Sequence, residues 1–170
     1  MAKTLPLTPR ISRLDRLLKG HPPELANAVA ASRFAFRLAH VLEASIDRAL
    51  APLDIGMREY LALVLIADHA IEPLRPSDLS STLDATRTQI TRLLDALEQK
   101  KLVQRIPGRT DRRSLSVSLT PAAKTLLRRA MPKVYAVYAT AWNPVGAVGT
   151  RETLARLQAA HAALHDASAP

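Results

Sequence analysis

The feature that most constrains this chain is a change of hydrophobic period within one short stretch, residues 84–120. From Ile90 to Leu97 the apolar residues recur at i, i+3, i+4 and i+7, which gathers them on one face of a helix. From Leu115 to Leu119 apolar residues alternate with serines, the pattern of a strand with one buried face. The stretch therefore predicts an amphipathic helix followed by a β-strand.

The start of this helix is predicted from Thr86 and Gln89, whose spacing fits a capping box. The first turn then offers Arg87, Thr88 and Gln89 to the outside. Residues in this position reach base edges when such a helix lies in the major groove of DNA. A short helix is predicted to begin at Pro76, and its tight connection to the next helix predicts a helix-turn-helix.

A β-hairpin is predicted after the helix, because Leu102–Ile106 can pair antiparallel with the strand at 115–119. Pro107 and Gly108 supply residues that favour a turn. Long charged loops on small hairpins are more often functional than incidental. The predicted loop carries four charged residues, Arg109, Asp111, Arg112 and Arg113.

The net charge of +9 is concentrated in the same stretch. Residues 87–113 hold eight Lys/Arg against three Asp/Glu, whereas residues 21–86 hold five against nine. Such a local excess is expected of a surface that binds phosphates. A merely solvated basic surface is the alternative.

Composition limits the class of protein. At 170 residues and 48% hydrophobic content, one domain with a real core is expected, and abundant Ala and Leu favour helix. No uncharged apolar run approaches the roughly 20 residues that span a bilayer, and no signal peptide is recognisable. We therefore expect a cytoplasmic, nucleoid-associated protein with no membrane partner. The absence of cysteine excludes disulfides and thiolate zinc sites.

The rest of the chain is predicted to be helical. Residues 1–23 contain a short basic amphipathic helix, Pro9–Lys19. Helix is also predicted over 24–51, 56–69, 76–83 and 121–141, then a loop at 142–149 and a final helix capped by Thr150.

Enzyme chemistry finds little support, because the P-loop, the dinucleotide-binding glycine pattern and the common hydrolase motifs are missing. We expect neither catalysis nor a cofactor. His161 and His165 lie one helical turn apart, but no cluster of carboxylates or thiols accompanies them. No metal site is therefore expected.

The order of these elements resembles the MarR family of winged helix-turn-helix regulators, and within it the EmrR (MprA) branch. The resemblance covers roughly Glu24–His165, and Asp111-Arg112-Arg113 and Leu119-Thr120 match the family pattern. It is sharpest in the segment RPSDLSSTLDATRTQITRLLDALEQKKLVQRIPGRTDRRSLSVSLTPAAKTLL.

The resemblance implies a mainly α fold with a small antiparallel β-hairpin wing, acting as a homodimer on double-stranded DNA. It divides the chain into an extension at 1–23, a dimerisation region at 24–55 and 121–170, and a winged helix-turn-helix at 56–120. The residues it places in the major groove are Thr86, Arg87, Thr88, Gln89, Thr91 and Arg92, and those it places in the wing contact are Arg109, Arg112 and Arg113.

Asp111 would hold a neighbouring wing arginine in position by a charge-assisted pair, the alternative being an ordinary surface ion pair. The function implied is a repressor that binds a pseudo-palindromic operator and is released by a small aromatic or anionic effector. A non-specific nucleic-acid-coating or architectural protein is the alternative.

A candidate effector pocket follows from the same resemblance, between the first two helices of the family body and the DNA-binding region. Its residues would be Arg37, His40, Met57, Tyr60 and Val64. Arg37 and His40 would orient an anionic aromatic ligand. For Met57 and Val64, simple core packing is the alternative.

Overall fold

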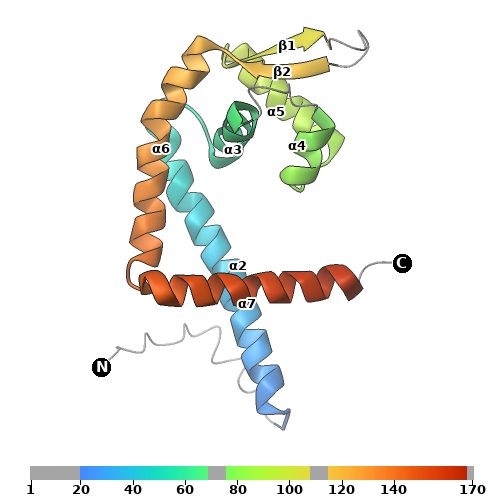
Figure 1. The fold of residues 1–170 in the computed structure, drawn as a ribbon, viewed down its shortest axis with the longest axis vertical. Helices are drawn as coiled ribbons and strands as arrows, with labels where there is room; N and C mark the ends of the chain where they lie inside the picture. Colours follow the sequence, from blue (N-terminus) through green and yellow to red (C-terminus); the bar gives the residue numbers. More distant parts are fainter. Residues whose placement is uncertain (1–19, 69–75, 108–114, 168–170) are drawn as a thin grey trace. The chain divides into compact units, whose positions relative to one another are not determined.

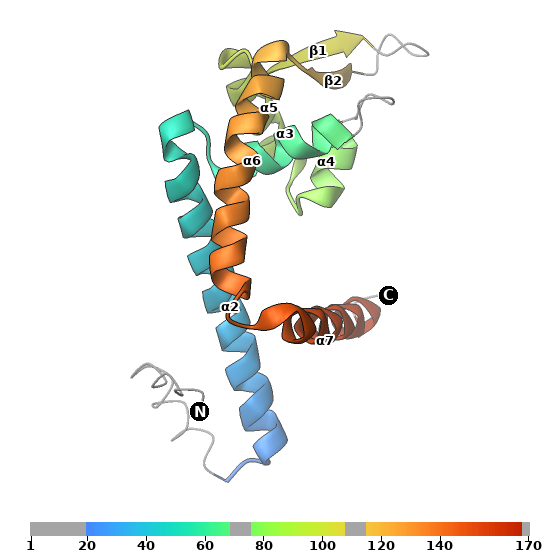
Figure 2. The ribbon, with the colours of Figure 1, turned by 60° about the vertical axis from the view of Figure 1, so that its left-hand side comes forward.

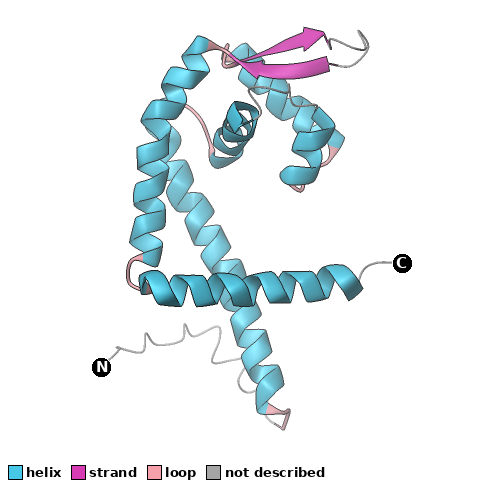
Figure 3. Ribbon diagram, viewed as in Figure 1, coloured by secondary structure: helices cyan, strands magenta, loops and turns pink. Residues whose placement is uncertain are grey.

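The computed structural model of the chain describes residues 20–68, 76–107 and 115–167. It is mostly helical, with a two-stranded antiparallel sheet, which confirms the predicted fold class (Figure 1; Figure 3). The predicted helix at Pro9–Lys19 and the wing loop lie outside the described residues. In chain order the elements are α2 (Pro23–Leu50), the 3-10 helix η1 (Ala51–Leu53), α3 (Met57–Asp68), α4 (Pro76–Thr82), α5 (Arg87–Gln99), β1 (Val103–Pro107), β2 (Leu115–Leu119), α6 (Pro121–Trp142) and α7 (Gly146–Ala167).

The chain divides by its internal contacts into two compact units, Met1–Glu43 and Ala44–Pro170, and the division falls within α2. In the first unit, none of the described residues is buried, and Phe36 is 76% exposed. The core lies in the second unit. None of the described helices is both long and apolar enough to cross a membrane.

Helix α3 supplies the centre of that core, as its apolar sequence predicts. It lies between α4 and α6 beneath the hairpin (Figure 2). Because α3 is covered on several sides, it buries more than one face, and Ala62 and Leu63 are inaccessible to solvent. The buried side chains packed with them from other elements include Leu79, Ile90, Leu94, Leu97, Val117 and Val134.

The two strands pair antiparallel as predicted, and the register places Val103 opposite Leu119 and Arg105 opposite Val117. The prediction of a turn at Pro107 was wrong, because Pro107 is the last residue of β1 and pairs with Leu115. The prediction that only one face of β2 is buried was wrong. Ser116 is 9% exposed, and the Ser118 hydroxyl is buried with no hydrogen-bond partner in the described structure. The reason is that β2 lies against α3, α4 and α6.

Helix α6 begins as predicted, with Thr120 as the N-cap and Pro121 in the first turn. The predicted loop at 142–149 was wrong, because α7 already begins at Gly146. Gly146 has a φ of +75°, so the chain turns within three residues and the next helix follows at once. Thr150 is therefore inside α7, where its hydroxyl donates to the Gly146 carbonyl at 2.8 Å.

Candidate nucleic-acid interface

The N-terminus of α5 is closed by the predicted capping box. The Gln89 backbone N–H donates to Thr86 Oγ1 at 3.3 Å, and the Thr86 backbone N–H donates to Gln89 Oε1 at 2.8 Å. Thr86 has an extended backbone, as an N-cap requires. The first turn is thus fixed by reciprocal bonds that satisfy two otherwise unpaired N–H groups.

The six predicted reading residues lie together on the exposed side of this first turn and a half. Arg87 and Arg92 take part in none of the ion pairs between described residues. The Thr91 hydroxyl donates back to the Arg87 carbonyl at 3.0 Å, so it faces outward only as an acceptor. Solvent reaches all six side chains, those of Thr86, Arg87, Thr88, Gln89, Thr91 and Arg92.

The turn between α4 and α5 is held by bonds across it. The Ala85 N–H donates to the Ser80 carbonyl at 3.1 Å, and the Ser80 hydroxyl donates to the Ala85 carbonyl. Asp84 takes a left-handed conformation with φ +49°, which aspartate tolerates better than most residues. Leu79 anchors α4 in the core. The two helices therefore form the predicted helix-turn-helix with a fixed connection.

The C-terminus of α5 ends in a Schellman motif. The Lys101 N–H donates to the Glu98 carbonyl and the Leu102 N–H to the Leu97 carbonyl, both at 2.9 Å. Leu97 and Leu102 are both buried. Lys101 occupies the position where glycine is favoured, with φ +56°.

Replacing Lys101 with glycine is expected to raise the free energy of unfolding by roughly 0.5–1 kcal/mol, because glycine relieves the left-handed strain at some cost in chain entropy. Urea denaturation measures this difference. Lys101→Ala is the matched control, since it removes the same charge but keeps the strain. A glycine variant no more stable than the alanine variant would contradict the prediction.

Lys100, at the same end of α5, is anchored to the start of α3. Its Nζ lies 3.1 Å from Glu59 Oε1 and 3.6 Å from the Asp54 carboxylate. Glu59 also accepts a bond from the Gly56 N–H at 2.9 Å, which caps α3. The positive charge of Lys100 is therefore paired with carboxylates of the protein itself.

Arg105 joins the hairpin to α5. Its guanidinium donates to Asp95, and its Nη1 lies 3.0 Å from Glu98 Oε2. The hydrogen bond to Asp95 raises the pKa of Arg105 above its ordinary value. The sequence analysis did not predict this contact and counted Arg105 only as one of the eight Lys/Arg of the basic stretch at 87–113. The sequence did contain a signal for this contact: Asp95 and Glu98 form an acidic pair, spaced i, i+3, in an otherwise basic segment.

The basic stretch therefore divides into two groups. Lys100 and Arg105 face carboxylates of the protein itself. Arg87, Arg92 and Lys101 are exposed beside the N- and C-terminal ends of α5. The four predicted wing residues lie outside the described residues, and their contact with DNA stays a prediction: Arg109, Asp111, Arg112 and Arg113.

The five residues of the predicted effector pocket belong to both units. Arg37 and His40 are exposed on the first unit. In the second unit, Met57 and Val64 pack against the core and Tyr60 is 5% exposed. Burial, with a smaller contribution from two nearby tyrosines, raises the pKa of Tyr60 above its ordinary value. The pocket itself stays a prediction.

Comparison with known proteins adds a family match. Residues 55–115 match the model of the MarR family. The chain is 29% identical over 105 residues to the transcriptional repressor MprA of Escherichia coli K12, covering 58% of this chain and 60% of MprA. It is 36% identical over 70 residues to the E. coli HTH-type transcriptional regulator PapX, covering 41% and 43%. The matches span three fifths or less of these relatives.

Solved structures share the fold over more of the chain. The Staphylococcus aureus MepR–DNA complex has a TM-score of 0.72 at 22% identity and covers 78% of this chain and 95% of MepR. An E. coli MarR mutant complexed with operator DNA has a TM-score of 0.72 at 21% identity, covering 79% and 95%. CouR of Rhodococcus jostii RHA1, bound to p-coumaroyl-CoA, has a TM-score of 0.68 at 25% identity, covering 74% and 87%.

Proposed function

Because this chain belongs to the MarR family of transcriptional regulators, we propose that it is a homodimeric, sequence-specific DNA-binding repressor that acts in the cytoplasm. The observation that carries the proposal is the first turn of α5. It is capped at Thr86, held against α4 by a bonded turn, and presents Arg87, Thr88 and Arg92 to solvent. A helix presented in this way suits the major groove, where arginine pairs with guanine.

The homodimer is supported by apolar side chains that each unit leaves exposed. Along the described helix α7 no residue is buried, and Val148, Leu154 and Leu157 are large apolar residues in contact with solvent. The α2 part of the first unit exposes Phe34 and Phe36. Helical stability in proteins comes mostly from packing of an apolar face. A second copy would supply that packing, and its two-fold symmetry requires half-sites about 34–36 Å apart.

Control by a small effector is part of the proposal. CouR, which shares the fold, was solved with p-coumaroyl-CoA, and MepR was solved with DNA. We propose that this chain likewise passes between a DNA-binding and a released state. The effector, small and either aromatic or anionic, must then bind the released state more tightly than the DNA-binding state.

A competition experiment separates this function from non-specific coating of nucleic acid, which the +9 charge also favours. Binding sites are first selected from random duplex DNA, and the best site is then competed with scrambled duplex at fixed salt. A specific repressor is expected to prefer its site by about 10³–10⁷-fold. Equal competition by scrambled DNA would support the coating protein and overturn the repressor.

A further inference from the structure

Helix α6 carries four exposed cations that lie outside the proposed reading residues. Its sequence contains four Lys/Arg and no Asp/Glu, so the electrostatic potential along it is positive. None of the four takes part in an ion pair between described residues. All four are exposed to solvent, and together we call them the α6 cation face: Lys124, Arg128, Arg129 and Lys133.

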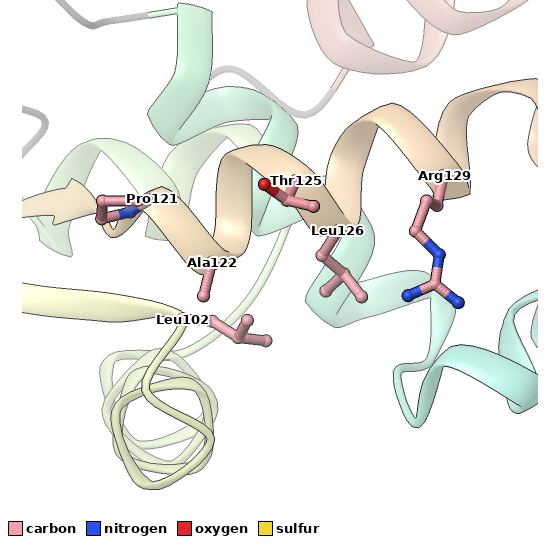
Figure 4. Close-up of a pocket in the computed structure, with 6 residues that line it drawn as sticks. All are labelled: Leu102, Pro121, Ala122, Thr125, Leu126 and Arg129. Carbon is pink, nitrogen blue, oxygen red and sulfur yellow. The ribbon is translucent and has the colours of Figure 1, made fainter.

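The four cations lie on the half of α6 that faces away from the core. The buried residues on the other half are Ala123, Leu127, Ala130 and Val134. Each cation stands next in sequence to one of these residues, so at about 100° per residue it lies on the solvent side of the helix. Arg128 donates through Nη2 to Thr125 Oγ1 at 3.0 Å. In Figure 4 the Arg129 side chain extends from α6 on the same side as Leu126, at one edge of this face. The cations thus share one exposed side of α6.

The α6 cation face is separate from the proposed reading turn of α5, residues 86–92. The hydroxyl of Thr120, the N-cap of α6, donates to the Lys101 carbonyl at 2.8 Å, so α6 begins beside the C-terminal end of α5. The reading turn is at the other end, and the 13 residues of α5 span about 20 Å. Figures 1 and 2 both show α4, from which the chain enters α5, on the side away from α6. The second unit therefore presents two cationic surfaces that do not overlap.

The spacing of the α6 cation face suits the phosphate backbone of a duplex. Residues 124–133 rise about 13–14 Å along the helix, and a duplex presents about eight phosphates over that length. Within this described stretch, the only exposed residues between the cations are Thr125 and Pro132, so the face offers charge without a large apolar side chain. Protein interfaces depend on buried aromatic or apolar anchors, whereas a phosphate backbone requires cations alone. Duplex DNA therefore fits this face better than an acidic protein does.

We propose that the α6 cation face binds the phosphate backbone of a second DNA duplex, so that one protein molecule can hold two duplex segments at once. The contact is independent of base sequence, because phosphate contacts position a protein on DNA and carry no sequence information. This inference goes beyond the proposed function, which concerns a single operator bound by the reading turns. The consequence is a bridge between the operator and another segment of duplex.

The test uses the full chain loaded with its selected operator at one duplex per dimer, so that the reading turns are occupied. A fluorescent duplex of scrambled sequence is then titrated into this complex, and its anisotropy is measured at several salt concentrations. Saturable binding is expected, with a Kd of about 10⁻⁴–10⁻⁶ M at physiological salt. The double variant Arg128→Gln/Arg129→Gln should bind this second duplex about 30-fold more weakly at 0.15 M salt, because each lost phosphate contact lowers the salt slope by about 0.9. Its preference for the operator over scrambled DNA should not change.

Arg151→Gln/Arg156→Gln is the matched control, because it removes two arginine charges from exposed positions of α7. It should bind the second duplex as the unmodified chain does. An equal loss in both double variants would mean that overall charge, and not this face, holds the duplex, and the proposal would be overturned. The absence of saturable binding to the operator complex also overturns it, as does undiminished binding by Arg128→Gln/Arg129→Gln.

Polyglutamate tests for an acidic protein as the partner of this face. Added at the same charge concentration as the duplex, it is expected to displace the second duplex poorly, because a flexible chain does not hold its charges in a fixed array. If polyglutamate binds, loses affinity in Arg128→Gln/Arg129→Gln, and the duplex does not bind, the partner is an acidic protein and the proposal is wrong.

Failure of the proposed function gives a different result from failure of this inference. If no operator can be selected, the proposed function fails, and scrambled duplex is titrated into the free chain instead. The reading-turn variant Arg87→Gln/Arg92→Gln is then compared with Arg128→Gln/Arg129→Gln. Losses in both variants that add when the four substitutions are combined support two separate DNA-binding surfaces. A loss in the reading-turn variant alone overturns the α6 cation face.

Discussion

Replacing Arg92 with alanine is expected to weaken binding to the selected operator by about 1–3 kcal/mol per half-site. Both subunits of a homodimer carry the substitution, so the contact is lost at both half-sites. Arg92 is exposed on α5, outside every ion pair between described residues, so its guanidinium is available for a base edge. Fluorescence anisotropy on the operator and on its single-base variants measures both affinity and preference. The expected result is a large loss on the operator and little change on scrambled DNA.

Arg92→Lys provides the matched control. It keeps the positive charge but lacks the planar pair of donors that fits guanine, so it should bind scrambled DNA normally and discriminate poorly at one position. If Arg92→Ala instead lowers the affinity for all DNA sequences alike and makes the dependence of affinity on salt concentration shallower, Arg92 contacts a phosphate. Unchanged affinity on every sequence would remove α5 from the proposed interface.

Replacing Leu157 with aspartate is expected to turn the dimer into a monomer. Leu157 lies on α7, is 47% exposed, and is one of the apolar residues for which a second copy provides the proposed contact. Burying an unpaired carboxylate in such a contact is strongly unfavourable. A monomer holds one half-site only, so operator affinity should fall by about 10²–10⁴-fold through loss of the linked second binding event. Analytical ultracentrifugation and DNA titration measure the two effects.

Gln158→Asp is the control for this variant, because it adds the same charge at the neighbouring exposed position of α7. It is expected to stay dimeric if the contact is made on the Leu157 side of the helix. Circular dichroism should show that both variants remain folded, since neither side chain is buried within the chain. A Leu157→Asp protein that sediments as a dimer and binds its operator normally would contradict the proposed interface.

Features encoded by neighbouring residues could be predicted from the sequence. The capping box depends on Thr86 and Gln89 alone, and the structure contains both of its bonds. The antiparallel pairing of the two strands followed from the alternation at Leu115–Leu119. The start of α6 at Thr120 was equally local. Each of these signals lies within a few residues of the feature that it predicts.

Features that depend on tertiary contacts could not be predicted in this way. The alternating sequence pattern predicted that Ser116 is exposed, but several helices pack on β2 and bury it. The charge count for residues 87–113 could not show that the hairpin places Arg105 against Asp95 and Glu98, because that contact depends on how β1 packs on α5. The loop predicted around Gly146 was wrong because three residues ending at one left-handed glycine are enough to turn the chain from α6 into α7, where a longer loop was expected (Figure 1).

The capping box also limits which bases the proposed reading helix α5 can recognise. A glutamine recognises adenine by using both halves of its amide, the oxygen as acceptor and the nitrogen as donor. In this chain the Gln89 oxygen already accepts two bonds, from the Thr86 N–H at 2.8 Å and from the Thr86 hydroxyl at 3.1 Å, and these occupy both of its lone pairs. While both bonds persist, Gln89 has only its NH₂ group to offer a base, and it can bind only hydrogen-bond acceptors. Within the proposed reading turn of α5, discrimination between bases is then left to the two arginines, to Thr88 and to Thr91 as an acceptor.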